Sequence, residues 1–99
     1  VDWHAPAAEI DRAIRAYTPG PGAWTTLRGE RFKLGPVTAA DTSELAPGAA
    51  AFSKNEVRVG TGNCDVVLGQ VQAPGKKKMA AADWARGLAD DAKEGVVFE

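Results

Sequence analysis

Hydrophobic residues near the start of the chain recur with the period of an α-helix. Ile10, Ile14 and Tyr17 fall at positions i, i+4 and i+7, which places them on one helical face. Pro6 suits the first turn of a helix, where no amide hydrogen is needed, and the proline- and glycine-rich residues 18–22 end the helix. The pattern predicts a helix over residues 6–17.

The following segments are punctuated like those of a β-protein. Residues 23–27 and 30–34 have strand-like composition, and Arg28-Gly29 between them is a plausible two-residue turn. Phe32 and Leu34 alternate with charged residues, which predicts a hairpin with one apolar and one basic face. Further short strands are predicted at residues 37–38, 50–52 and 57–60, and a mostly buried strand at residues 65–72. Five or six short strands at this spacing favour a small closed or partly open β-barrel over residues 23–72.

Two elements follow the predicted barrel. Residues 73–79 have the composition of a loop and carry three consecutive cations, Lys76, Lys77 and Lys78. Trp84 and Leu88, four positions apart, predict a last helix over residues 81–92. The predicted fold class is therefore mainly β, or α+β by count, with an N-terminal and a C-terminal helix in one domain over residues 1–99.

Length and composition exclude several classes of protein. The chain has 99 residues, of which 44% are hydrophobic and 25% charged, so it can form one modest core but not a complete cofactor enzyme. Its one cysteine, Cys64, permits no internal disulfide. No apolar run approaches the roughly 20 residues that cross a bilayer, so we expect a cytoplasmic protein with no membrane partner. Because the chain starts at Val1 rather than Met, we expect a domain of a longer polypeptide. We also expect it to be a monomer.

Few residues are suited to catalysis. His4 is the one histidine and is predicted to be a capping or surface residue, and Cys64 lies in a turn without a second cysteine. The chain has no His, Cys and carboxylate cluster at metal-ligand spacing and no phosphate-binding glycine pattern. We therefore expect no catalytic residue, no metal and no cofactor in this domain. Trp3, Trp24 and Trp84 could stack on bases, but their apolar neighbours favour core packing.

The formal net charge of -1 hides a strong segregation of charge along the chain. Taken alone, a near-neutral total argues against nucleic acid, which is bound mainly through Lys and Arg. Residues 1–11 carry a net charge of -3, as do residues 83–99, whereas residues 12–82 hold ten basic and five acidic side chains. A basic middle between acidic ends is compatible with polyanion binding, because only charges within about 8 Å of a phosphate matter strongly. The lysine triplet is equally compatible with a solvated loop.

Three separated motifs resemble the C-terminal domain of methionyl-tRNA formyltransferase. Residues 1–3 and 7–25 resemble its opening, with an Ile-Asp-x-x-Ile-Arg-Ala helix and a Pro-x-Pro-Gly-Ala turn. The similarity resumes at residues 59–62, and again at residues 71–84, where the family has a Pro-Gly-Lys-Lys-x-Met loop. The resemblance spans nearly the whole chain in the right order.

The resemblance implies an OB-like β-barrel that follows an N-terminal catalytic domain, absent from this chain, which holds 10-formyltetrahydrofolate. It implies that the parent enzyme formylates the amino group of methionyl initiator tRNA in translation initiation, and that this domain holds the tRNA without catalysing the reaction. Lys76 and Lys77 match the family's Lys-Lys pair, and Lys78 is an additional cation. The expected tRNA-binding residues are Lys76, Lys77 and Lys78, aided by Arg28, Arg31, Lys33, Lys54 and Arg58. Arg15 matches the arginine of the helix motif and could serve packing or a salt bridge as readily as RNA.

Two departures from the family pattern bear on stability. Asn63-Cys64 replaces a common Asp-Gly, which predicts a weaker turn, and Ala80 replaces a serine that would cap the last helix.

Two other functions stay open. The domain could belong to a related small-molecule formyltransferase or a formyltetrahydrofolate hydrolase and line its active-site entrance. It could also be a structural module without a ligand. The Pro-Gly-Lys-Lys-x-Met loop favours the tRNA enzyme.

Overall fold

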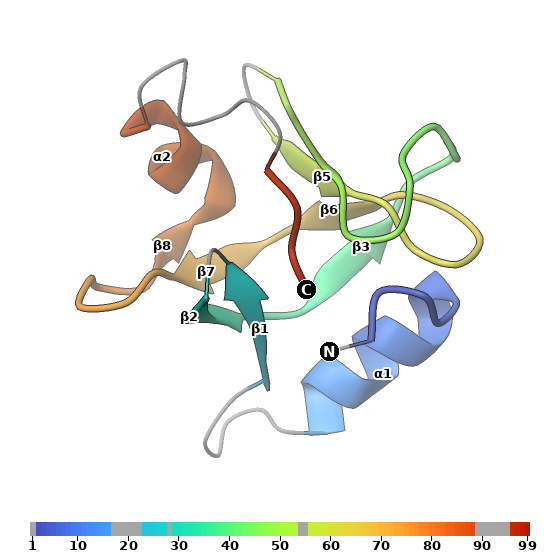
Figure 1. Cartoon of the computed structure of the whole chain (residues 1–99), viewed down its shortest axis with the longest axis horizontal. Coiled ribbons are helices and arrows are strands. Elements are labelled where there is room, and N and C mark those ends of the chain that lie inside the picture. Colours follow the sequence, from blue (N-terminus) through green and yellow to red (C-terminus); the bar gives the residue numbers. More distant parts are fainter. Residues whose placement is uncertain (1, 17–22, 28, 54–55, 89–95) are drawn as a thin grey trace.

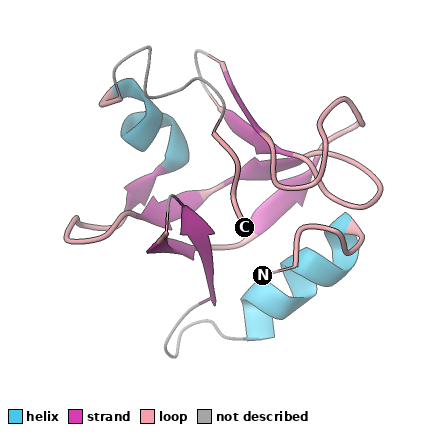
Figure 2. Cartoon of the chain, in the orientation of Figure 1, coloured by secondary structure: helices cyan, strands magenta, loops and turns pink. Residues whose placement is uncertain are grey.

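The chain folds into two small antiparallel sheets flanked by two helices (Figures 1 and 2). A computed structural model describes residues 2–16, 23–27, 29–53, 56–88 and 96–99. In chain order the elements are α1 (Ala7–Ala16), β1 (Ala23–Leu27), β2 (Glu30–Leu34), β3 (Val37–Ala39), β4 (Ala50–Phe52), β5 (Val57–Val59), β6 (Val66–Leu68), β7 (Gln70–Gln72), β8 (Met79–Ala80) and α2 (Ala81–Arg86). The mainly-β class with two helices is confirmed.

Two segments of the chain pass from one sheet into the other. The first sheet has the strand order β1-β2-β7-β8 and the second β3-β6-β5-β4. The segment β2–β3 therefore changes sheet, and so does β6–β7 beside it, where the Gly35 amide donates to the Gln70 carbonyl at 2.8 Å. The single strand expected at residues 65–72 is wrong, because it is interrupted at Gly69 and its halves pair in different sheets.

The strands of the predicted barrel form these two separate sheets. Among the described residues they do not close into one ring. Eight short strands replace the expected five or six among the described residues, because the strand expected at residues 65–72 is divided into β6 and β7 and because β8 forms at Met79–Ala80, where the end of a loop was predicted. The last residues join the two sheets: Phe98 bridges to Leu27 of β1, and Val97 bridges to Ala49 just before β4. The C-terminal segment thus lies across the open side between the sheets.

An aromatic cluster fills the core between the sheets. The ring of Phe98 lies 5.3 Å from that of Phe32, 6.0 Å from that of Trp3 and 6.4 Å from that of Trp84, measured between centroids. Trp3 is also held by a buried hydrogen bond, since its Nε1 donates to Thr25 Oγ1 at 2.9 Å. The Thr25 hydroxyl in turn donates to the Glu99 carbonyl at 2.8 Å. The expectation of core packing is confirmed for Trp3 and Trp84.

Helix α1 packs through its predicted apolar stripe. Ile10 and Ile14 are buried, whereas Tyr17 lies outside the described residues. The helix begins at a cap provided from far along the chain, because Asn63 Oδ1 accepts a hydrogen bond from the Ala7 amide at 2.9 Å. The same oxygen accepts from the Cys64 amide at 2.8 Å. Asn63 therefore supports both the turn and the helix, and the expected weakening of the turn, which rests on the missing glycine at position 64, stays a prediction.

Helix α2 ends earlier than the spacing of Trp84 and Leu88 indicates. It stops at Arg86 with Gly87 as C-cap, so the predicted helix over residues 81–92 is wrong at Gly87 and Leu88, and residues 89–92 lie outside the described residues. At the other end, Ala80 has an extended backbone and offers no side-chain cap. The expected loss of a cap at Ala80 is confirmed.

Substitution of Ala80 by serine should therefore stabilise the domain. A serine hydroxyl at the N-cap accepts a hydrogen bond from an amide in the first turn, and we expect a gain of about 0.5–1 kcal/mol in the free energy of unfolding. Chemical denaturation of Ala80→Ser against Ala82→Ser measures it. Ala82 lies inside α2, where a hydroxyl cannot cap, so equal effects of the two substitutions would contradict this explanation.

Candidate nucleic-acid interface

The outer face of the first sheet carries a row of cations along β2. Phe32 and Leu34 point inward and are buried, so the alternation of a strand turns Arg31 and Lys33 outward, where both are exposed. The hairpin that holds them is regular, with five paired positions between β1 and β2. Gly29 in its turn has a φ of +80°, a conformation that glycine adopts without strain.

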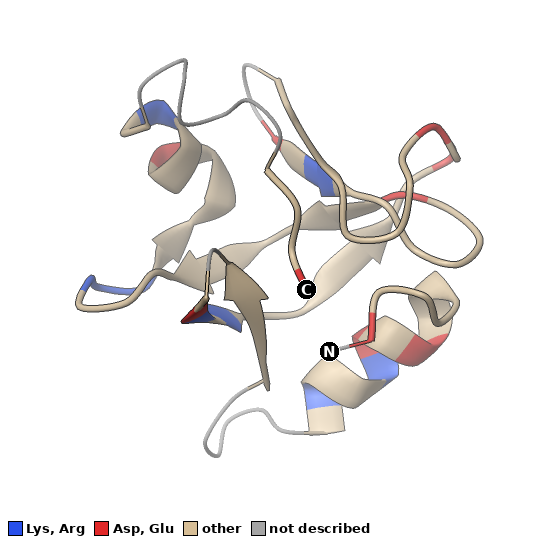
Figure 3. Ribbon diagram, viewed as in Figure 1, with Lys and Arg blue, Asp and Glu red and all other residues tan. Residues whose placement is uncertain are grey.

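The three lysines of the loop lie beside this row. Lys33 is paired with Gln72 of β7, and the Gln72 side chain donates from Nε2 to the Lys76 carbonyl at 3.0 Å. Lys76, Lys77 and Lys78 are all exposed. Figure 3 shows blue both on β2 and on the loop that precedes β8, at one side of the molecule. The structure therefore brings five of the eight predicted RNA-binding residues, Arg31, Lys33 and the lysine triplet, onto neighbouring segments.

A hollow of about 440 Å³ separates β2 from the start of the loop. It is lined by Arg31 and Lys33 on one side and by residues 72–75 on the other, with Glu30 also contributing. The two cations in its lining are suited to an anionic group such as a phosphate.

The charges of this surface are not neutralised within the described part of the chain. No acidic side chain there forms an ion pair with Arg31, Lys33 or the lysines of the loop. Elsewhere, Arg15 pairs with Asp11 at 2.7 Å and Arg86 pairs with Asp83. Arg15 therefore makes the salt bridge that was one of its expected roles.

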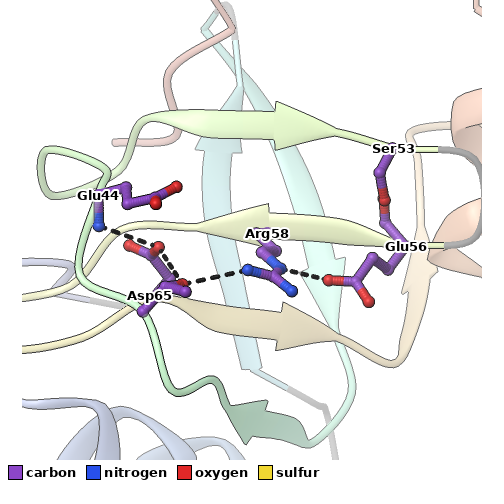
Figure 4. Close-up of polar contacts among 6 residues, drawn as sticks. Glu44, Ser53, Glu56, Arg58 and Asp65 are labelled. Carbon is purple, nitrogen blue, oxygen red and sulfur yellow. Dashed lines mark hydrogen bonds and ion pairs between the residues drawn. The ribbon is translucent and has the colours of Figure 1, made fainter.

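Arg58 lies in the second sheet and is engaged in a polar network (Figure 4). Its Nε forms an ion pair with Glu56, and its Nη1 donates to the Thr42 hydroxyl at 3.1 Å. The hydrogen bond and charge of Glu56 raise the pKa of Arg58 above its ordinary value, so the side chain stays charged and held. The interface defined above therefore does not include Arg58, and the predicted Arg28 and Lys54 lie outside the described residues.

Beside Arg58, the carboxylate of Asp65 organises the segment before β4. Asp65 is 1% exposed and accepts hydrogen bonds from the Thr42 hydroxyl at 2.8 Å and from the amides of Glu44 and Leu45, each at 3.1 Å. Burial favours the neutral form of the Asp65 carboxyl, but these donors and the Arg58 charge outweigh burial and lower its pKa. The charges of Glu56, Arg58 and Asp65 are therefore engaged in contacts within the domain.

Trp24 lies on the outer face of the first sheet, so the expectation that it packs in the core is wrong. It is 45% exposed instead of buried, and the Arg31 guanidinium carbon lies 4.4 Å from the centre of its ring. The strand alternation could have shown this, because Ala23 and Thr25 on either side of Trp24 are buried.

The remaining candidates have structural surroundings. His4 is exposed, and Cys64 is half-buried against the core with its amide bound by Asn63 and Thr61. No group of three His, Cys, Asp or Glu side chains placed to hold a metal ion occurs among the described positions. None of the helices described is long and apolar enough to span a membrane.

The chain was compared with known families and proteins. It matches the family described as "Formyl transferase, C-terminal domain" over residues 1–89. A methionyl-tRNA formyltransferase of Streptomyces coelicolor is 61% identical over 88 residues, which cover 88% of this chain and 28% of that protein. Proteins of the same name from Corynebacterium glutamicum and Corynebacterium diphtheriae are 56% and 52% identical, over 89% and 99% of this chain and 29% and 31% of their own lengths.

The chain thus spans less than a third of the length of these curated relatives. The resemblance drawn from the helix, turn and lysine-loop motifs is confirmed. Because the family match covers most of the chain, these residues belong to the formyl transferase C-terminal domain family.

Proposed function

We propose that these 99 residues are the tRNA-binding part of a methionyl-tRNA formyltransferase and supply affinity and orientation without taking part in the chemistry. The observation that carries the proposal is the placement of five exposed cations, Arg31, Lys33 and the loop lysines, on neighbouring segments beside a hollow of about 440 Å³. Formyl transfer from 10-formyltetrahydrofolate to methionyl initiator tRNA is then the work of an N-terminal domain outside these residues.

Electrostatics support this use of the surface. Phosphates are bound chiefly by lysine and arginine side chains that displace counterions, and only nearby charges contribute at physiological salt. The cations lie on one sheet face and its adjoining loop, whereas the acidic side chains of Glu56 and Asp65 are engaged in the second sheet. The net charge of -1 therefore does not oppose RNA binding at this face.

Replacing Lys76, Lys77 and Lys78 together with alanine should weaken binding of an initiator tRNA transcript. Each lost phosphate contact lowers the steepness of log affinity against log salt by about 0.7–0.9, so loss of three contacts should lower it by about 2–3 and weaken binding roughly 100-fold or more near 0.1 M salt. Fluorescence anisotropy at several salt concentrations measures affinity and slope together.

A control variant removes the same charge elsewhere. Arg12, Arg15 and Arg86 are exposed on the helices, so replacing all three with alanine changes net charge equally and should leave most of the affinity. Equal losses in the two variants would show that only total charge matters and would contradict the role of the loop. If the unaltered chain shows no salt-dependent tRNA binding, the proposed function is wrong and a small-molecule formyltransferase becomes the better explanation.

A further inference from the structure

Trp24 presents a large aromatic ring on the same outer face as the cations. Its place there follows from the hairpin register, in which Trp24 is paired with Lys33 and is the diagonal neighbour of Arg31. Diagonal neighbours on one face of an antiparallel pair are within reach of long side chains. The Arg31 guanidinium lies over the ring, with its central carbon 4.4 Å from the ring centroid.

This contact differs in kind from those of the other engaged arginines in the described chain. Arg15, Arg58 and Arg86 are each held by a carboxylate, which fixes the side chain and also offsets its charge. The indole ring of Trp24 carries no net charge, so it restricts Arg31 without neutralising it. A cation that is held but not neutralised is suited to bind an anion from outside.

The position of Arg31 also points to an anion. Arg31 lines the hollow between β2 and the loop together with Lys33 and Gln72. Gln72 is bound to the Lys76 carbonyl, so contacts continue from the sheet face into the lysine loop. Glu30 lines the same hollow but forms no ion pair with Arg31 or Lys33, all three of which are described.

We propose that Trp24 is a positioning residue that holds the Arg31 guanidinium at the β2 hollow, where Arg31 binds a backbone phosphate of RNA. This inference rests on the proposed tRNA-binding function. Trp24 restricts the Arg31 side chain before RNA binds, so Arg31 loses less conformational entropy on binding. The planar guanidinium then donates two parallel N–H groups to the phosphate oxygens. Lys33 and the loop lysines bind neighbouring phosphates as point charges.

The first experiment tests the contact without RNA. In the NMR spectrum of the free chain, the ring current of Trp24 should shift the Arg31 side-chain Nε–H resonance upfield. The shift should disappear in Trp24→Ala and persist in part in Trp24→Phe, which retains an aromatic face. An Arg31 resonance that is the same in the unaltered chain and in Trp24→Ala would overturn the proposal, whatever the chain does with RNA.

The second experiment measures how Trp24 and Arg31 are coupled in RNA binding. Affinity for an initiator tRNA transcript is measured for Trp24→Ala, Arg31→Ala and the double variant. Trp24→Ala should weaken binding about two- to fivefold, the range expected for a cation–π contact at an exposed site. In the Arg31→Ala background, Trp24→Ala should have almost no further effect, and Trp24→Phe alone should recover part of the affinity.

A control variant and three outcomes distinguish the role of Trp24 from the proposed tRNA-binding function. Val97 is a second exposed large hydrophobic residue in the described part of the chain, and Val97→Ala should leave RNA affinity unchanged. Weaker binding on loss of Trp24 even without Arg31 would mean that the indole contacts RNA directly, which overturns a positioning role. Salt-dependent tRNA binding that Trp24→Ala leaves unchanged would overturn this inference alone, whereas no tRNA binding by the unaltered chain would overturn both.

Discussion

Replacing Phe98 with alanine should lower the free energy of unfolding by about 3–5 kcal/mol, the range for truncating a buried aromatic side chain. Phe98 is 2% exposed, and its ring contacts those of Trp3, Phe32 and Trp84 between the two sheets. A cavity there would be lined by rings that strands and bridges hold in place, so it cannot collapse fully. Urea denaturation followed by circular dichroism measures the loss.

The neighbouring residue provides a matched control. Val97 lies in the same bridging segment but is 48% exposed, so Val97→Ala removes little buried area. We expect a cost of less than about 1 kcal/mol for it. Similar costs at the two positions would mean that the segment stabilises the domain through its backbone bridges rather than through the Phe98 ring.

Replacing Asp65 with asparagine should produce the second large effect, a loss of about 1–3 kcal/mol at pH 7. The Asp65 carboxylate accepts hydrogen bonds from the Thr42 hydroxyl and from the amides of Glu44 and Leu45. Asparagine has only one acceptor oxygen, and its NH₂ group would face a donor and leave that donor without an acceptor. Because Asp65 is buried, water cannot replace the lost acceptor. Chemical denaturation of both proteins gives the difference.

The same substitution should change how stability depends on pH. The pKa of Asp65 is lower in the folded state than in the unfolded chain, where it is about 3.9. The stabilisation from the carboxylate is therefore fully present above about pH 5 and is lost as pH falls through the folded-state pKa. We expect the advantage of the unaltered protein over Asp65→Asn to shrink between pH 5 and pH 3.

The control for this pH effect is Asp41→Asn, which changes an exposed carboxylate in the segment between β3 and β4. It should cost less than about 0.5 kcal/mol at any pH. An advantage over Asp65→Asn that stays constant from pH 7 to pH 3 would contradict the role assigned to the Asp65 charge.

Local patterns were sufficient to predict much of the fold. The period of Ile10 and Ile14 indicated α1, and the alternation of Phe32 and Leu34 with charges indicated the hairpin, because helix periodicity and strand pleat are decided by neighbouring residues. Gly69 was a local signal for a break in the apolar run at residues 65–72, but the change of sheet there could not be predicted, because it depends on which distant strands pair with β6 and β7. The early end of α2 did have a local signal in Gly87.

The candidate site was predictable to a similar degree. Charge alternation along β2 and the lysine triplet located the cations, but only the fold shows that Gln72 joins the two segments. The exclusion of Arg58 depends on its ion pair with Glu56, which directly precedes β5 and lies two positions away, a spacing that could have indicated the pairing. The contact between Trp24 and Arg31 requires the hairpin register, which becomes definite only when the turn length is known.

The hydrogen bonds from Trp3 to Thr25 and from Thr25 to Glu99 attach residues near both ends of the chain to β1. Trp24 and Thr25 are adjacent in β1 and face opposite sides of the sheet, one toward the cationic surface and the other toward the core. The Thr25 hydroxyl therefore joins Trp3, near one end of the chain, to Glu99 at the other. The strand that presents Trp24 on its outer face is thus the strand to which Trp3 and Glu99 are bound on the core side.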